Sequence, residues 1–295
     1  NRSKRSLQKF TMKRSWVKNS DLMKLISILT KGTLFLFVVI LFSCGTKNEG
    51  CTDANASNFD VSADANCCCI YPQLGVQFIY YNGLKIVGAN DTFIDADNNR
   101  FVVDKVKFYV SGINYILESG EVLRSDKRVW LYLTPGNGND STRSIDDYAL
   151  IDRAQNTLRS LTLTGNTKIQ RLEFLMGVVD SALTNQPVFM KNLDHPLAPN
   201  RDSMYNVTGS KYMTMKIIYR GANDATIHDT LYLEGLDARV PVGLNVFVEN
   251  KVGFDALIPI KVRLDKLFEG VRLKEDNHDE LITRIKANSK NIFEK

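Results

Sequence analysis

Alternating apolar and polar residues recur along most of this chain, and the pattern restricts it to a fold built from β-strands. In the clearest stretch, residues 105–110, Val, Phe and Val alternate with Lys, Lys and Tyr. Successive side chains of a strand point to opposite faces, so this stretch predicts a half-buried sheet with one apolar and one polar face. The same alternation occurs at residues 128–133, 169–176, 211–219 and 258–264. Clusters of Gly, Asn, Asp and Pro separate these segments, which predicts an all-β fold, a Greek-key type antiparallel β-sandwich.

The connections between the strands are of two kinds. Ser119-Gly120 is expected to form a two-residue hairpin turn, and residues 95–99 a solvated hairpin tip, because Arg100 replaces the Gly that a calcium loop requires. Residues 186–209 are too long for a simple turn. Long loops on a β-scaffold often carry binding residues, so this segment is the first place to look for a site.

The C-terminal residues have a different pattern. Asn277 is a suitable N-cap for a helix from His278 to about Asn288, with Leu281, Ile282 and Ile285 on one side. The apolar stripe is short, which favours a helix docked on the domain over a partner-binding helix. Residues 272–295 are therefore expected to form a C-terminal helical tail.

An apolar run near the N-terminus predicts export. Residues 34–42 are apolar, follow the basic Lys24 and Lys31, and end at Ser43-Cys44-Gly45. The run is too short to cross a bilayer as a helix, and its ending resembles a bacterial lipobox, in which the cysteine is lipidated and becomes the first residue. A short uncleaved anchor or a buried core helix would leave the Ser-Cys-Gly ending unexplained. We therefore expect residues 1–43 to be an upstream segment and signal peptide.

Lipidation of Cys44 would tether the protein to a membrane. Gly45 provides no signal for inner-membrane retention, so we expect outer-membrane sorting, with the body facing the periplasm or the cell surface. Beyond residue 43 the chain has 29 Lys and Arg against 32 Asp and Glu, a formal charge of −3, although the whole chain carries +5. The basic balance belongs to the segment expected to be removed and gives no reason to expect nucleic-acid binding.

Cysteine placement agrees with export. All five cysteines lie between Cys44 and Cys69. A catalytic thiol would be expected inside the globular domain, near a base. With Cys44 lipidated, Cys51 and the adjacent Cys67, Cys68 and Cys69 form an even set, as expected in an oxidising compartment.

Residues 50–72, GCTDANASNFDVSADANCCCIYP, are similar to a short module of Gram-negative surface proteins that opens with Gly-Cys-Thr-Asp and closes with a cysteine before Ile-Tyr-Pro. The resemblance implies a disulfide between Cys51 and Cys69. The sequence leaves three alternatives for Cys67 and Cys68: a strained vicinal bridge, pairing elsewhere, or free thiols. Adjacent cysteines point in different directions, which disfavours zinc, whereas calcium binding by the loop carboxylates is an unspecific alternative. Residues 44–73 are expected to form a lipid anchor and Cys-rich cap.

Catalytic and cofactor motifs are absent from the sequence. It has no Gly-x-Ser-x-Gly elbow, phosphate loop, His-Glu-x-x-His motif or dinucleotide fingerprint. The three histidines, His195, His228 and His278, leave little room for a multi-histidine metal site. An enzyme is therefore the least favoured class of function.

Several segments in a fixed order carry a family resemblance. They are VKFYVS (106–111), YALID (148–152), EFLMGVVD (173–180), HPLAP (195–199), Met204-Tyr205, residues 209–217 and LDKLF (264–268). In order and spacing they resemble the MbnP-like copper-binding domain family, named for a methanobactin-associated periplasmic protein. The resemblance covers residues 74–271. It implies an extracytoplasmic β-sandwich that captures copper with histidine and an oxidised tryptophan.

The residues available for copper are few. Cu(I) is soft and accepts imidazole and thioether ligands, so His195 and Met204 are the candidate ligands, with Met213 or Met215 as further thioethers. Met213 and Met215 alternate on a predicted strand, share one face and are more readily explained as core residues. His195, before Pro196 in the long loop, is the best single candidate.

Other positions depart from the family pattern. Asn206 follows Met204-Tyr205 where the family commonly has tryptophan, and Leu233 stands where members often have histidine. Trp130, on a predicted strand, is the only tryptophan beyond residue 43. The fold therefore carries over better than the copper site.

Two functions are favoured over an enzyme. The first is a lipid-anchored protein that captures or handles copper. The second is a metal-free surface interaction protein or accessory subunit, which contacts an outer-membrane partner through its loops and cap.

Overall fold

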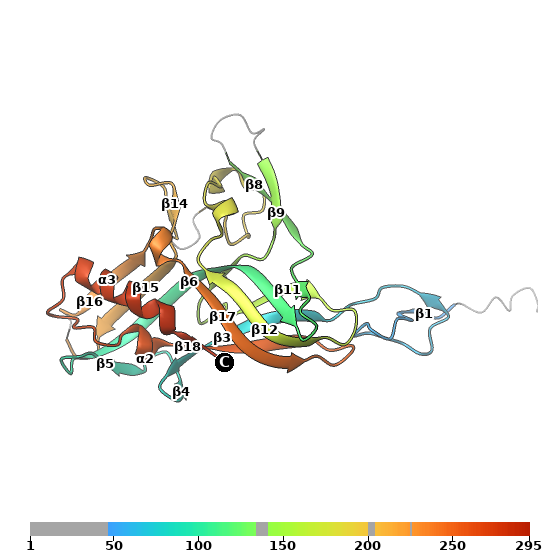
Figure 1. The fold of residues 1–295 in the computed structure, drawn as a ribbon, viewed down its shortest axis with the longest axis horizontal. Helices are drawn as coiled ribbons and strands as arrows, with labels where there is room; N and C mark the ends of the chain where they lie inside the picture. Colours follow the sequence, from blue (N-terminus) through green and yellow to red (C-terminus); the bar gives the residue numbers. More distant parts are fainter. Residues whose placement is uncertain (1–46, 134–140, 200–203, 225) are drawn as a thin grey trace, which may run out of the picture. The chain divides into compact units, whose positions relative to one another are not determined.

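The apolar faces of two β-sheets pack together in the computed structural model, which describes residues 47–133, 141–199, 204–224 and 226–295. Within these residues the larger sheet has eight strands, and its main path runs β16-β15-β6-β12-β17 (Figure 1). Three short strands, β5, β7 and β10, pair with the long central strand β6. The strands are β5 (Thr92–Ile94), β6 (Arg100–Leu117), β7 (Val122–Leu123), β10 (Ala149–Ile151), β12 (Lys168–Met176), β15 (Met215–Gly221), β16 (His228–Leu233) and β17 (Val240–Glu249).

The smaller sheet combines strands from the first part of the domain with strands near the C-terminus. Its central strands, β3 and β18, are far apart in the sequence but lie side by side and run parallel. β11 and β4 pair antiparallel with β3, and the final strand β19 pairs antiparallel with β18. The strands are β3 (Gln73–Asn82), β4 (Lys85–Ile86), β11 (Thr157–Thr162), β18 (Ala256–Arg263) and β19 (Phe293–Glu294).

Short elements complete the chain. Helix α3 contacts strand β16 at one end of the larger sheet (Figure 1). Among the residues described, no helix has the length and apolar character that crossing a membrane requires. Residues Glu49–Lys295 form one compact unit. The remaining elements are β1 (Glu49–Gly50), β2 (Ala65–Asn66), β8 (Arg128–Tyr132), β9 (Ser141–Ile145), β13 (Tyr205–Asn206), β14 (Lys211–Tyr212), α2 (Leu264–Leu267), α3 (His278–Asn288) and the 3-10 helices Asp180–Ala182, Pro187–Phe189, Leu236–Ala238 and Ser289–Asn291.

The predicted fold class is confirmed: the structure is an all-β sandwich with a short C-terminal helix. The helix also begins where the sequence predicts. The Asn277 side chain accepts hydrogen bonds from the backbone N–H groups of Asp279 and Glu280, and the Glu280 carboxylate accepts one from the Asn277 N–H. This reciprocal capping satisfies N–H groups that would otherwise have no partner in the first turn.

The main core lies between the two sheets. Phe78 of β3 packs edge-on against Phe108 of β6 and Phe174 of β12, with ring centroids 5.7 and 5.6 Å apart. Val106, Phe108 and Val110 all belong to this core, as their alternation predicts.

The opposite face of β6 differs from the prediction of a polar, solvated surface. Lys107, Tyr109 and Ser111 are only 8, 1 and 0% exposed. Tyr109 belongs to a second apolar cluster, built with residues of the β8–β9 hairpin and of the long loop. Covering of this face by other segments therefore explains why the prediction was wrong here.

Both predicted hairpin connections form, with corrections. Leu117 and Glu121 are joined by a backbone hydrogen bond across Glu118–Gly120, so the loop has three residues and not two. Gly120 takes a positive φ of 86°, which suits its position at the end of such a loop. In residues 95–99, Asp95 is only 5% exposed and accepts backbone hydrogen bonds from Asp97, Asn99 and Leu273. Residues 96–98 of the tip are exposed, as predicted, and Asp95 fastens the tip to the C-terminal segment.

Candidate functional site

The described parts of the long loop, residues 186–199 and 204–209, lie on the outer face of the larger sheet and contribute to a second apolar cluster, which we call the outer cluster. Tyr109 of β6 supplies its floor, since neighbouring Phe108 and Val110 point into the main core. The Tyr212 ring packs edge-on against Tyr109 at 5.6 Å, and its hydroxyl donates to the Leu197 carbonyl. The outer cluster consists of Tyr109, Leu131, Tyr148, Leu150, Val178, Ala182, Met190, Leu197, Met204, Tyr212 and Met213.

His195 lies at the margin of the outer cluster and is only 5% exposed. Its ring packs against Tyr148, with centroids 5.9 Å apart. Nε2 lies 3.0 Å from the Asp146 carboxylate, and Nδ1 accepts a hydrogen bond from the Leu197 N–H at 3.1 Å. Because the Leu197 N–H donates to Nδ1, this nitrogen must carry a lone pair. The ring proton therefore sits on Nε2, which donates it in a hydrogen bond to Asp146. Both ring nitrogens therefore have protein partners.

Three thioethers lie in the outer cluster. Met204 is fully buried, and Met190 and Met213 are nearly so. The Met204 carbonyl accepts a hydrogen bond from the Met213 N–H, so the two residues lie side by side at the open end of the β13–β14 hairpin. The Met190 sulfur lies 3.5 Å from the Asn185 amide nitrogen.

Met213 and Met215 do not share a face, contrary to the sequence prediction. β14 ends at Tyr212 and β15 begins at Met215, so residues 213–214 interrupt the strand. The alternation is broken at this interruption. Met213 consequently packs in the outer cluster, whereas Met215 packs in the main core.

The two positions at which the family resemblance led us to expect tryptophan and histidine have structural roles here. The Asn206 side chain accepts a hydrogen bond from the Gly209 N–H and closes the turn between β13 and β14. Leu233 is fully buried in the main core and pairs with Met215. Trp130 of β8 is 53% exposed and lies opposite Arg143.

The other two histidines lie apart from the outer cluster. His228 is exposed at the start of β16. Nδ1 of His278 lies 2.8 Å from the Asp229 carboxylate. In the part of the chain that the structure describes, no group of three or more His, Cys, Asp or Glu residues could hold a metal ion.

These residues do not fit a preformed copper site. A copper ligand must present a free lone pair, and the Nδ1 lone pair of His195 is used by Leu197 while Nε2 carries a proton. Copper binding there would require the loss of one of these two hydrogen bonds. The geometry instead gives His195 a structural role, in which it fastens the long loop to the segment before β10.

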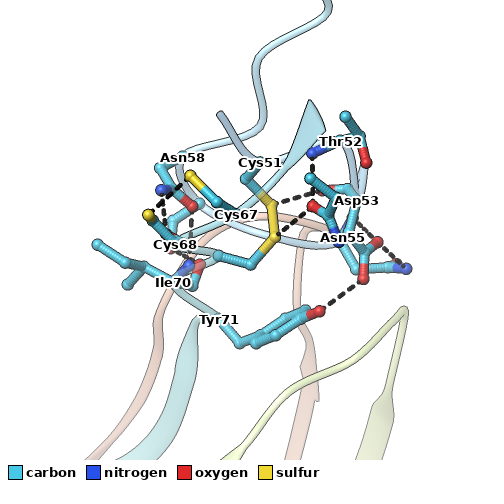
Figure 2. The surroundings of a disulfide bond; sticks show 12 residues. Cys51, Thr52, Asp53, Asn55, Asn58, Cys67, Cys68, Ile70 and Tyr71 are labelled. Atoms are coloured by element: carbon cyan, nitrogen blue, oxygen red, sulfur yellow. Dashed lines mark hydrogen bonds between the residues drawn. A yellow bond between two sulfur atoms is a disulfide. The ribbon is translucent and has the colours of Figure 1, made fainter. Parts of the chain in front are cut away.

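The cap contains the disulfide expected between Cys51 and Cys69 (Figure 2). Cys67 and Cys68 are free thiols. The carboxylate of Asp53 accepts hydrogen bonds from the Asn55 N–H and the Tyr71 hydroxyl, which lower its pKa. These hydrogen bonds occupy lone pairs of Asp53 that calcium binding would need. Cys44 lies outside the described residues.

Sequence reasoning missed the residues that position these groups. Asp146, the partner of His195, lies 49 residues away in the sequence, and no local pattern marks it. The Asn58 side chain, which bonds the backbone on both sides of Cys69, was likewise not singled out. The one available signal for Asp146 was its place just before the YALID segment.

Comparisons with known proteins give two matches. The MbnP family model matches residues 74–286, which is well over half of the chain. Among solved structures, MbnP from Methylosinus trichosporium matches with 15% sequence identity and a TM-score of 0.42, over 70% of this chain and 86% of that chain. The search of curated proteins found no match to this chain. The family match begins with β3 and ends within α3, so it excludes the cap and β19.

Proposed function

The chain belongs to the MbnP family, and from that premise we propose that it is a lipid-anchored extracytoplasmic binding protein that works without a copper centre at His195. The observation that supports this proposal is the engagement of both His195 ring nitrogens, by Asp146 and by the Leu197 N–H. The departures from the pattern that the family resemblance implies, Asn206 in place of tryptophan and Leu233 in place of histidine, agree with the proposal. In this proposal the protein is not an enzyme, and its ligand is a protein of the outer membrane.

Copper capture is the second candidate function. It is favoured by the gathering of Met190, Met204 and Met213 in the outer cluster and by His195, which packs against Tyr148 of the same cluster. Thioethers and imidazole are suitable ligands for Cu(I). This function would require the His195 ring to leave Asp146 or Leu197 when copper binds.

Cu(I) titration of the full chain, purified from membranes in detergent, separates the two functions. We expect His195→Ala to lower the free energy of unfolding by about 2 kcal/mol, because a buried N–H and a carboxylate lose their partner. We expect it to leave Cu(I) uptake, measured against a coloured Cu(I) chelator, equal to that of the wild type. His228→Ala, at an exposed position, is the control. Stoichiometric copper that disappears only in His195→Ala would establish copper capture and refute the metal-free proposal.

The anchor is tested separately at Cys44. Mass spectrometry of the N-terminal peptide is expected to show a chain that begins at Cys44 and carries fatty acyl groups, and Cys44→Ala is expected to abolish both processing and acylation. Fractionation should then place the variant away from the outer membrane. An unmodified chain in the wild type would overturn the anchor.

A further inference from the structure

Two free thiols converge at the surface of the cap. The Sγ atoms of Cys67 and Cys68 lie 2.7 Å apart and form a hydrogen bond (Figure 2). Cys68 is exposed and Cys67 is partly exposed. Adjacent cysteines were expected to point in different directions, so this convergence requires a cause.

The cause is the backbone conformation of Cys68. Its φ is +59°, in the left-handed region that residues other than glycine rarely adopt. This conformation costs roughly 1–2 kcal/mol, so the surroundings must impose it. The Asn58 side chain does so: its amide nitrogen donates to the Cys68 carbonyl at 2.8 Å and its oxygen accepts the Ile70 N–H at 2.8 Å. The Cys67 N–H is fixed by a 2.9 Å bond to the Gly50 carbonyl.

We propose that Cys67 and Cys68 are a reversible dithiol–disulfide site that exchanges electrons with small disulfides such as oxidised glutathione. The site is distinct from the Cys51–Cys69 bridge, which closes the cap loop with its Cα atoms 4.8 Å apart. Adjacent Cα atoms are only about 3.8 Å apart, which is shorter than the usual span of about 4.4–6.8 Å in disulfides. A Cys67–Cys68 bridge is consequently strained, and strained disulfides are the easily reduced ones.

The exchange balances in two steps. The exposed Cys68 thiolate attacks one sulfur of oxidised glutathione, forms a mixed disulfide and releases one glutathione thiolate. Cys67 then gives its proton to the released glutathione thiolate and attacks the Cys68 sulfur of the mixed disulfide, which releases the second glutathione thiolate. The hydrogen bond to Cys68 and partial burial raise the pKa of Cys67 to about 11, which agrees with Cys68 acting first. Two electrons pass from the protein to glutathione, and the reverse reaction restores both thiols.

The test uses the full chain in detergent, equilibrated in glutathione buffers of graded ratio and then alkylated. A single tryptic peptide, residues 48–85, contains Cys51, Cys67, Cys68 and Cys69, because no Lys or Arg lies between Lys47 and Lys85. We expect this peptide to change from two alkyl groups to none as the buffer becomes more oxidising. We expect Cys67 and Cys68 to be reduced at a glutathione ratio roughly tenfold or more less reducing than the one that opens Cys51–Cys69.

Variants report on the mechanism. Cys67→Ser should accumulate a stable glutathione adduct on Cys68, because the second step is missing. Asn58→Asp keeps the acceptor for Ile70 but loses the donor to Cys68, and should make the Cys67–Cys68 bridge several-fold less favourable. Ser62→Ala, which removes a cap hydroxyl bonded to Asp60, should not change it.

Two results would overturn the proposal. One is a peptide that keeps both alkyl groups at every ratio, including pure oxidised glutathione. The other is fragmentation, after cleavage before Asp53 and Asp60, that joins Cys51 to Cys67 or Cys68. Both readouts come from the wild-type protein and hold even if a variant fails to fold.

Discussion

Phe293→Ala is expected to lower the free energy of unfolding by about 3 kcal/mol, although residue 293 is the third from the end of the chain. Phe293 is 8% exposed, and its ring lies 5.2 Å from Phe174, 5.7 Å from Phe108 and 6.2 Å from Phe78. Edge-to-face pairs of this kind add to the effect of burial alone. The loss of the ring would leave a cavity where both sheets meet.

Urea denaturation of the wild type and the variant measures this effect. The control is Phe254→Ala, because Phe254 is 67% exposed and its loss is expected to cost under about 0.5 kcal/mol. Equal midpoints for Phe293→Ala and the wild type would show that β19 does not complete the core. The prediction matters for the boundary of the domain, because the family match ends at residue 286 and excludes Phe293.

The sequence predicted the fold class because the period of a strand is a local property. Val106, Phe108 and Val110 point into the main core as their spacing requires, and Asn277 caps its helix as its position requires. The parallel pairing of β3 with β18 had no such local signal, since it depends on which distant strands meet. The same reason explains why the tail was expected to be a helix alone, without the strand that follows it.

The candidate site was less accessible to sequence reasoning. The sequence marked His195 as unusual, but its chemistry depends on Asp146 and on the Leu197 N–H, which only the folded loop brings to the ring. The pairing of Cys51 with Cys69 came from a resemblance to a known module. The convergence of Cys67 and Cys68 depends on a positive φ at Cys68, which no residue preference would predict.

The alternation of apolar and polar residues also did not predict that charged side chains of β6 would be buried. Lys107 and Asp152 belong to the VKFYVS and YALID segments, whose strands β6 and β10 pair. Lys107 Nζ lies 2.9 Å from the Asp152 carboxylate, and their side chains are only 11 and 16% exposed. Lys216 lies opposite Lys107 in β15 and is also buried. These family segments therefore have a structural explanation that involves no ligand.

Asp152→Ala is expected to lower the free energy of unfolding by about 3–5 kcal/mol, the usual effect of removing one partner of a buried ion pair. Besides Lys107, the carboxylate accepts the N–H groups of Ala154 and Gln155, each at 2.8 Å. Its loss would leave the Lys107 charge buried opposite Lys216. Lys107→Met should cost less, because Asp152 keeps its two backbone hydrogen bonds and the methionine replaces the apolar stem of the lysine.

Urea denaturation as a function of pH checks the cause of this loss. Burial acts to raise the pKa of Asp152, but hydrogen bonds from Gln155, Lys107 and Ala154 outweigh it and lower the pKa. A depressed pKa in the folded state gives stability that is present above the unfolded value, about 3.9, and is lost as the pH falls through the folded value. The difference between the wild type and Asp152→Ala should therefore be largest near neutral pH and shrink below about pH 4. A difference that stayed constant down to pH 2 would mean that packing, and not the carboxylate charge, carries the effect.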